Sequence, residues 1–355
     1  MIEGKGRNTD EQAYREITLD SSSSLKDFAL DRRKYFRKYI ANEQVKEDDN
    51  QASIMGRVVE VLLLEPEKFD DKFHMSACVS APTGLGLKFV EALYKFTSEA
   101  TDEQGNVTRS FEDISTDAYE AAGYKLPYAT IIKQFVGSDS EIYYNEIRTV
   151  RAKNLTVVTA DDVANGERIV EALKINEFTA DIINLINSKR YEVKNQFQIE
   201  GYELDGHKFK SMIDKVIVDH FKRTIQIYDL KCTWSVENFY TEYYLYRRAY
   251  IQAYLYWIAI VSLTLTPDEE SEWYGYTVEP PRFIVCDSIN YYAPLIYELS
   301  VDDLADAYEG FEYKGRQYPG VAQLISELQW ALDNNVWNIS RENYENKGRV
   351  KLIGK

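Results

Sequence analysis

The sequence contains few residues able to form covalent or metal cross-links, with three cysteines and three histidines among 355 residues. Cys78, Cys232 and Cys286 form no C-x-x-C pair, which argues against a disulfide framework and against a zinc or iron–sulfur site. The longest apolar stretch, residues 256–265, is much shorter than the roughly 18 residues that a membrane-spanning helix needs. The first six residues lack the apolar core of a signal peptide. We therefore expect a protein of the reducing cytoplasm with no membrane span.

Basic side chains are in the minority, since 42 Lys and Arg face 58 Asp and Glu, which gives a net charge of −16. A chain this acidic is a poor non-specific ligand for nucleic acid, although a local basic groove or divalent metal ions can offset its field. No two histidines have the spacing of metal ligands, which argues against a zinc hydrolase. The sequence also lacks a G-x-S-x-G elbow and a P-loop, which argues against serine hydrolases and ATP-driven nucleases.

The N-terminal part is predicted to hold two helices after a flexible arm over residues 1–20. The serines of residues 21–24 precede apolar residues at helical spacing and can cap a helix. The opposite face of that helix is the densest basic cluster of the chain, and it includes Arg32, Arg33, Arg37 and Lys38. This face is either solvated or in contact with phosphates. A second helix is expected over residues 51–64, because a proline follows at position 66.

The remaining pattern predicts an α/β fold. Residues 75–190 have helical patterns. Short β-rich runs follow at 191–200, 207–219 and 224–233, then a long aromatic helix over 236–262. Further strands are expected at 282–287 and 291–299, and helices at 301–308 and 320–334. We thus predict one domain over 21–355, divided into N-terminal helices (21–75), a mainly helical insertion (76–190), a core (191–300) and C-terminal helices (301–355).

Two carboxylates are expected to meet in the hairpin formed by residues 207–219 and 224–233. Asp229 and Lys231 follow Ile225 and Ile227 at a spacing of two residues, so all four lie on one face of the strand. Charge on such an apolar face is costly unless it is coordinated or functional. A turn at residues 220–223 places Asp214 directly opposite Asp229, with Cβ atoms about 5 Å apart. Adjacent carboxylates repel unless a proton or a cation lies between them, and oxygen ligands favour Mg²⁺ or Mn²⁺. The alternative places both carboxylates at exposed strand ends.

The aromatic helix carries Tyr244, Arg248, Gln252 and Tyr256 at i, i+4 spacing, which predicts one continuous stripe. A buried glutamine between aromatic residues needs hydrogen-bond partners. Taken alone, this stripe is interpreted more simply as core packing, in which the tyrosines pack and Gln252 caps a backbone group.

Together these residues resemble the PD-(D/E)xK nuclease superfamily. Ile213-Asp214, Asp229-Leu230-Lys231 and the segment from Gln252 to Tyr256 are similar to the D…D-x-K and Q-x-x-x-Y motifs of its RecB-type, exodeoxyribonuclease VIII (RecE)-like and lambda-exonuclease-like branch. The segment Gly56–Phe69 and the Ser24-Leu25-Lys26 start of the first helix also resemble this branch. Glu60 stands where that branch usually has histidine, but a carboxylate is common there elsewhere in the superfamily.

The resemblance implies a restriction-endonuclease-like core, with a central mixed β-sheet flanked by helices. It also implies that Asp214, Asp229, Glu60 and the Leu230 carbonyl hold Mg²⁺, for which Mn²⁺ can substitute, and that Lys231 orients or deprotonates the attacking water. Gln252 and Tyr256 would position the lysine, the phosphate or the metal shell. Arg248, one turn before Gln252, is a candidate phosphate contact.

The expected activity is a Mg²⁺-dependent exonuclease that acts on linear DNA in recombination, repair or phage DNA processing. One alternative is an endonuclease for branched or single-stranded DNA. The other is a non-catalytic member of the same fold that binds DNA ends or a protein. The expected partners are duplex DNA ends, a single-strand annealing recombinase and, by the resemblance, further copies of the chain in a ring. The expected location is the cytoplasm of a bacterium or of a phage-infected host.

Overall fold

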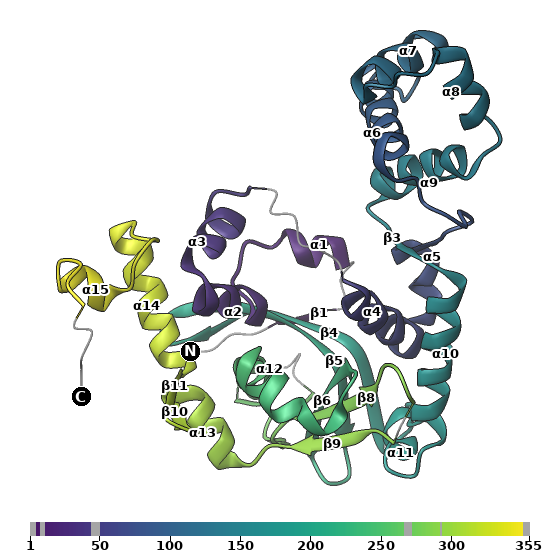
Figure 1. The fold of residues 1–355 in the computed structure, drawn as a ribbon. Coiled ribbons are helices and arrows are strands. Elements are labelled where there is room, and N and C mark those ends of the chain that lie inside the picture. Colours follow the sequence, from purple (N-terminus) through teal and green to yellow (C-terminus); the bar gives the residue numbers. More distant parts are fainter. Residues whose placement is uncertain (1–4, 8–10, 44–49, 266–271, 292, 351–355) are drawn as a thin grey trace. The chain divides into compact units, whose positions relative to one another are not determined.

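The computed structural model describes residues 5–7, 11–43, 50–265, 272–291 and 293–350 (Figure 1). The chain divides into two compact units. The first comprises Met1–Glu65 and Glu167–Lys355, and the second comprises Pro66–Gly166. The expectation was a single domain over 21–355 with an insertion at 76–190. The helical insertion is present, but it forms a unit with its own boundaries.

A mixed β-sheet is the centre of the first unit. The strand order is β1-β4-β5-β6-β8-β9, with β7 paired to β6. β4, β5 and β6 form an antiparallel meander, whereas β6 and β8 are parallel. The strands are β1 (Lys5–Arg7), β4 (Tyr191–Leu204), β5 (His207–Asp219), β6 (Thr224–Thr233), β7 (Thr277–Val278), β8 (Arg282–Asp287) and β9 (Leu295–Glu298). The predicted mixed α/β core is confirmed.

The turn between β5 and β6 lies at residues 220–223, as predicted. Asp219 pairs with Thr224, and the ladder continues in this register to Lys215 and Tyr228. The parallel pairing of β6 with β8 needs a crossover, which α12 (Ala249–Leu265) provides. The register and the crossover fix which side chains of β6 face α12.

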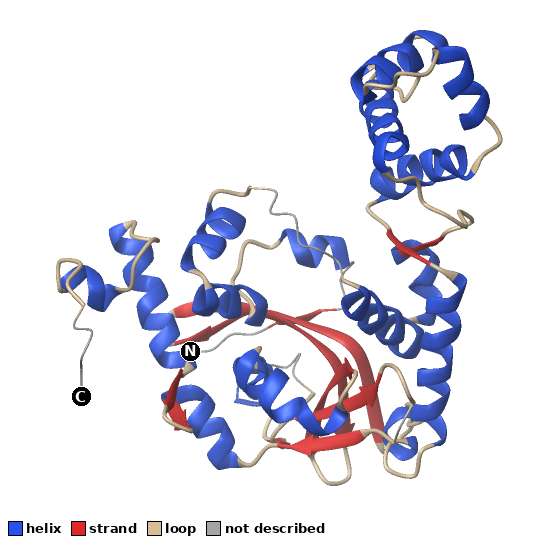
Figure 2. Ribbon diagram, viewed as in Figure 1, coloured by secondary structure: helices blue, strands red, loops and turns tan. Residues whose placement is uncertain are grey.

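Helices cover both faces of the sheet (Figure 2). α12 packs on the face that carries Ile225 and Ile227, and α2 (Ser22–Leu30) lies beside it in the same hydrophobic core. α4 (Gln51–Leu64) and α10 (Ala160–Ile175) belong to a second core, which includes Tyr228 of β6 and Ile284 of β8. Because the apolar residues 169–173 of α10 join this core, residues 167–190 belong to the sheet unit and not to the insertion.

The described part of the expected N-terminal arm, residues 1–20, has regular structure. β1 pairs with β4, and a short helix, α1 (Glu11–Glu16), follows. Lys210 of β5 explains why this segment is held. Its ammonium donates hydrogen bonds to the carbonyl oxygens of Tyr14, Arg15 and Ile17, at 2.8, 3.2 and 2.7 Å. A cation at the end of a helix satisfies carbonyl groups that have no partner within the helix. The expectation of a loose arm is wrong for these residues.

Most predicted boundaries of the first unit hold. Ser21 and Ser24 form a capping box at the start of α2, and α4 ends before Pro66. The aromatic helix over 236–262 is different, because it is broken into three pieces. The remaining elements are α3 (Arg32–Tyr35), η1 (Phe36–Ile40), α11 (Ala180–Ile183), η3 (Val236–Asn238), η4 (Tyr240–Tyr246), α13 (Val301–Glu309), β10 (Gly310–Tyr313), β11 (Arg316–Pro319), α14 (Val321–Asn334) and α15 (Arg341–Glu345).

The second unit is mainly helical. Phe89, Leu93, Ile114 and Phe135 belong to its hydrophobic core. Its helices and strands are η2 (Pro66–Lys68), α5 (Phe69–Lys72), β2 (Phe73–Met75), α6 (Gly84–Glu99), α7 (Phe111–Ala122), α8 (Tyr128–Phe135), α9 (Asp139–Lys153) and β3 (Thr156–Val158). β2 and β3 pair in parallel. The candidate site described below lies within the first unit.

Candidate carboxylate–lysine site

The hairpin opens where the two predicted aspartates lie. The last backbone pair of the β5–β6 ladder is Lys215 with Tyr228, and one further step in this register places Asp214 opposite Asp229. The Asp214 carboxylate accepts the backbone N–H of Leu230 at 2.8 Å. The Asp214 side chain thus takes a backbone N–H of β6, and the site begins where the backbone pairing of β5 with β6 ends.

Asp229 is almost completely buried, with an exposed fraction of 2%. Its Oδ1 accepts a hydrogen bond from Gln252 Nε2 of α12 at 2.8 Å, and its Oδ2 forms an ion pair with the ammonium of Lys231. Lys231 Nζ also donates to the Leu230 carbonyl oxygen at 3.4 Å. The predicted D-x-K pair is therefore a direct contact, and the alternative of exposed strand ends is wrong for Asp229.

The charges of this cluster act strongly on one another. Burial, followed by the charges of Asp229 and Glu60, raises the pKa of Asp214 well above its ordinary value. Burial lowers the pKa of Lys231, but the charges of Asp229, Asp214 and Glu60 outweigh this effect and raise the pKa above its ordinary value. Lys231 is thus held protonated, whereas ionisation of Asp214 is opposed.

Glu60 reaches the same cluster from α4. Its charge contributes to the pKa values of Asp214 and Lys231, and its Oε1 accepts a hydrogen bond from Gln196 Nε2 at 2.7 Å. Gln196 lies on β4 between two residues paired to β5, and its φ of +47° places it in the left-handed region. A non-glycine residue with positive φ marks a local irregularity of the strand. This irregularity occurs directly beside Asp214.

Gln252 and Tyr256 are neighbours on α12, as their spacing predicts. Gln252 Nε2 donates to Tyr256 Oη at 2.8 Å, and its Oε1 accepts a hydrogen bond from Lys26 Nζ of α2 at 3.1 Å. Burial, followed by the charges of Asp214 and Asp229, raises the pKa of Tyr256 well above its ordinary value. The phenol is therefore neutral at physiological pH.

A cavity of about 1140 Å³ lies next to this cluster. Tyr256 and Lys26 line it, whereas Asp214, Asp229, Lys231 and Glu60 do not. Its wall also includes Lys38, Tyr39 and Arg247. The cavity is large enough for a ligand of nucleotide size, and its wall combines cations and aromatic rings with the carboxylates of Glu16, Asp20 and Asp27.

Arg248 is not in the predicted stripe. Its φ of +57° is left-handed, and it separates η4 from α12. Tyr244 and Gln252 are consequently on different helical segments. Burial lowers the pKa of Arg248, and the groups whose charges affect it are Tyr250, Arg316 and Tyr318. These groups do not belong to the carboxylate cluster, so a role for Arg248 beside Gln252 has no support in the geometry.

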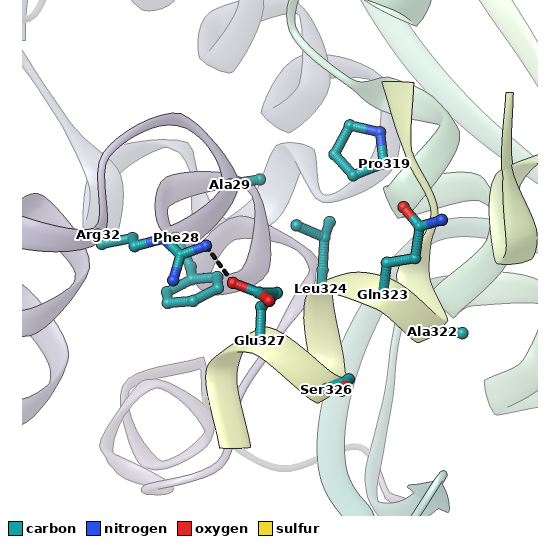
Figure 3. Close-up of a pocket in the computed structure, with 9 residues that line it drawn as sticks. All are labelled: Phe28, Ala29, Arg32, Pro319, Ala322, Gln323, Leu324, Ser326 and Glu327. Atoms are coloured by element: carbon teal, nitrogen blue, oxygen red, sulfur yellow. Dashed lines mark hydrogen bonds and ion pairs between the residues drawn. The ribbon is translucent and has the colours of Figure 1, made fainter. Parts of the chain in front are cut away.

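Most cations of the predicted basic face already have carboxylate partners. Arg32 pairs with Glu327 at 2.6 Å in a pocket between α2 and α14 (Figure 3). Arg37 pairs with Glu43 at 2.7 Å, and Lys38 contacts Asp27 at 3.5 Å. Arg33 is exposed and has no ion-pair partner within the described residues. These pairs offset much of the local charge, and phosphate contact by this face stays a prediction.

Two residues of the cluster were absent from the predicted site. Lys26 belongs to the Ser24-Leu25-Lys26 segment, so the sequence offered a signal for it. Gln196 had none, because a single glutamine in a β-rich run indicates nothing about a kink or about a partner on another helix.

The donor chemistry of the cluster fits a hard cation, since it consists of carboxylate, amide and carbonyl oxygens. Gln196 Oε1 supports this fit, because it is buried beside Glu60 and has no hydrogen-bond partner in the described part of the chain. Within that part, however, no three Asp, Glu, His or Cys side chains are already grouped closely enough to hold a metal ion. Binding would require the carboxylates to move closer together.

No protein-family model matches the sequence, and no curated protein matches it. Among solved structures, the chain is similar to the crystal structure of a putative exonuclease from Eubacterium rectale. The TM-score is 0.47 and the sequence identity is 13%, over 98% of this chain and 96% of that chain. A likeness of this size carries no functional conclusion. None of the helices that the structure describes has the length and apolar character needed to cross a membrane.

Proposed function

We propose that this protein is a metal-dependent nuclease that hydrolyses phosphodiester bonds of DNA, and that it acts on the ends of linear DNA. The observation that carries the proposal is the cluster of Asp214, Asp229, Lys231 and Glu60, in which Asp229 is buried and the other three residues are partly buried. Three carboxylates around one ammonium are expensive to bury, and a structural role would be served better by apolar residues.

Mg²⁺, or Mn²⁺ in its place, is part of this proposal. Asp214, Asp229, Glu60 and the Leu230 carbonyl would hold the ion, and Gln196 Oε1 would be available as a further oxygen ligand. When bound, the ion would lower the pKa of a water molecule and polarise a phosphoryl oxygen. Its charge would also offset the burial and the carboxylate repulsion that together raise the pKa of Asp214.

The side chains of the site have separate tasks in this proposal. Lys231 is held protonated by its carboxylate neighbours, so it would orient the attacking water and stabilise negative charge on the phosphorane-like transition state. Gln252 fixes Asp229 through a direct hydrogen bond. Tyr256 is neutral and lines the cavity, so its hydroxyl is available to a phosphate oxygen.

The cavity supports a nucleic-acid substrate in a chain whose net charge opposes one. Arg247 brings positive charge to its wall, where Lys38 contacts Asp27, and Tyr39 offers an aromatic surface for a base. The side chains at its inner end connect the cavity with Asp229 through Gln252.

The test is incubation of the purified protein with linear and with covalently closed duplex DNA, in Mg²⁺, in Mn²⁺ and in EDTA. We expect loss of linear DNA only, and only with a divalent ion. Asp229→Ala is expected to abolish this loss while circular dichroism shows an unchanged fold. Cleavage of the closed circle would favour the endonuclease alternative. Binding of DNA ends without any cleavage would favour the non-catalytic alternative, and full activity of Asp229→Ala would refute the site.

Three further expectations belong to this proposal. The protein would act in recombination, repair or phage DNA processing in the cytoplasm. It would work with a single-strand annealing recombinase and would assemble with further copies of itself. Copurification and analytical ultracentrifugation test the two associations.

A further inference from the structure

We propose that Lys26 is a positioning residue that acts through Gln252, and that it fixes the direction in which the Gln252 amide presents its N–H groups to Asp229 and Tyr256. This inference rests on the proposed function for its kinetic consequences. Its geometric basis is independent, because it needs only the contacts among these four side chains.

The orientation of the Gln252 amide is determined from both of its ends. An ionised carboxylate can only accept hydrogen bonds, so the amide nitrogen must face Asp229. An ammonium can only donate, so the amide oxygen must face Lys26. The second N–H of the amide donates to Tyr256. The two N–H groups and the oxygen of the Gln252 amide thus each have a partner in a single orientation of the amide.

Loss of the ammonium would leave the Gln252 oxygen without its donor in a buried place. Gln252 is only 9% exposed. A buried acceptor without a partner is costly, and the amide can lower this cost by rotating. A partial rotation of the amide toward water in the cavity that Lys26 lines would weaken the N–H hydrogen bond from Gln252 to Asp229. Lys26 therefore protects the hydrogen bond that orients Asp229.

The electrostatic environment of Lys26 agrees with this role. Burial, followed by the positive charge of Lys231, lowers the pKa of Lys26 to about 8, while the charges of Asp229, Asp27 and Asp214 act in the opposite direction. An ammonium in this place is close enough to the cluster to interact with three of its charged groups. Its ammonium donates a hydrogen bond to Gln252 and forms no ion pair with Asp214 or Asp229 of the described residues, so we assign it a positioning role and not a catalytic one.

A double-mutant cycle separates this role from direct contact with substrate. Lys26→Met removes the donor and keeps the aliphatic length, and Gln252→Met removes the amide. We expect Lys26→Met to lower kcat by about 10- to 100-fold, as is typical when a residue that orients a metal ligand is lost, with KM nearly unchanged. The double variant is expected to be no worse than Gln252→Met within about twofold. Lys26→Arg, which keeps a donor, is expected to recover most of the rate.

The control is Lys208→Met, which removes an exposed lysine at the start of β5. It is expected to leave both kcat and KM unchanged. If the effects of Lys26→Met and Gln252→Met instead multiply in the double variant, or if Lys26→Met raises KM alone, Lys26 acts on substrate directly and the inference is wrong.

A second readout does not depend on activity. The side-chain amide signals of Gln252 are identified in ¹⁵N NMR spectra by their loss in Gln252→Met. We expect Lys26→Met to shift these signals and Lys26→Arg to leave them close to wild type. Unchanged amide signals in Lys26→Met would overturn the inference. If the wild type cleaves no DNA with any divalent ion, the proposed function fails, and the NMR comparison still decides whether Lys26 orients Gln252.

Discussion

Asp214→Asn should make the protein more stable when no divalent ion is present, although it removes a residue of the proposed active site. The substitution deletes one carboxylate charge from a partly buried cluster that also contains Asp229 and Glu60. The side-chain oxygen of Asn keeps an acceptor for the Leu230 N–H, which now binds Asp214 at 2.8 Å. The change therefore removes charge while it preserves the local hydrogen bond.

The expected gain follows from the separation of the charges. Directly opposite residues of an antiparallel pair have Cβ atoms about 5 Å apart. Two like charges about 5 Å apart repel by about 3 kcal/mol at an effective dielectric constant of about 20, and carboxylate groups that point away from each other repel less. Part of this gain is lost, because Asp214 also attracts Lys231. We expect a net increase in the free energy of unfolding of about 1–2 kcal/mol.

The pH dependence provides a second signature. Because the pKa of Asp214 is raised on folding, the folded chain binds this proton more tightly than the unfolded chain. The wild type must then lose stability as pH rises above the ordinary value of 3.8, and Asp214→Asn must not show this contribution. The difference between the two proteins is expected to be small at pH 4 and to grow toward neutral pH.

Asp219→Asn is the matched control, since it is the same substitution on the same strand. Arg190 forms hydrogen bonds with Asp219, the shorter at 2.8 Å, and lowers the pKa of that carboxyl. This variant should be less stable than wild type near neutral pH, because folding favours the ionised form of Asp219, which Asn cannot adopt. Thermal and urea unfolding in EDTA, between pH 4 and pH 8, measure both variants. If Asp214→Asn is destabilised as Asp219→Asn is, the carboxylates of the site do not repel one another and the electrostatic reasoning is wrong.

Other substitutions test the remaining roles. Lys231→Ala should keep DNA and metal binding but lose about 10²- to 10⁴-fold in turnover; calorimetry that shows lost Mg²⁺ binding in a folded variant would contradict this role. Glu60→His should retain more activity with Mn²⁺ than with Mg²⁺, because imidazole suits Mn²⁺ better, whereas wild-type rates in Glu60→Ala would place Glu60 outside the site. Replacing Arg33 and Arg37 together by Gln should reduce the log–log salt slope of DNA binding by up to about 0.9 per lost contact, and an unchanged slope would indicate a solvated face. Lys215 is buried, and burial lowers its pKa to about 8. Lys215→Met should therefore raise the free energy of unfolding at pH 7 by on the order of 1–3 kcal/mol, and it should remove a rise in stability that the wild type shows between about pH 8 and 10.5. If both proteins have the same pH dependence of stability, this prediction is wrong.

The sequence predicts the parts of this site that local patterns control. The two-residue period of β6 places Asp229 and Lys231 on the face of Ile225 and Ile227, and the position of the β5–β6 turn determines the strand register. The i, i+4 spacing brings Gln252 and Tyr256 together. Each of these relations depends on residues close to one another in the chain or on one short turn, and this is why they could be predicted.

The remaining parts depend on backbone irregularities and on distant contacts. Arg248 fits a helical stripe in the sequence, yet its left-handed backbone divides the helix and removes it from that stripe. Gln196 is similarly held in a left-handed conformation on β4. Neither residue is a glycine, so the sequence contains no signal for positive φ. Lys26 and Gln252 are 226 residues apart, and no periodicity connects positions at that separation.

The irregular positions and the buried charges occur in the same place, and this coincidence has a physical meaning. A regular β4–β5–β6 meander would pair its backbone throughout and would leave no reason to bury Asp214 and Asp229. Here Gln196 departs from regular strand geometry beside Asp214, and Asp214 itself binds the backbone of β6. Strained backbone and unfavourable pKa values each reduce stability, and proteins concentrate both where function requires them. The stability that Asp214→Asn is expected to recover is therefore a measure of what the cluster costs the fold. A cost that persists in the native sequence is best explained by a ligand that the charges are there to bind.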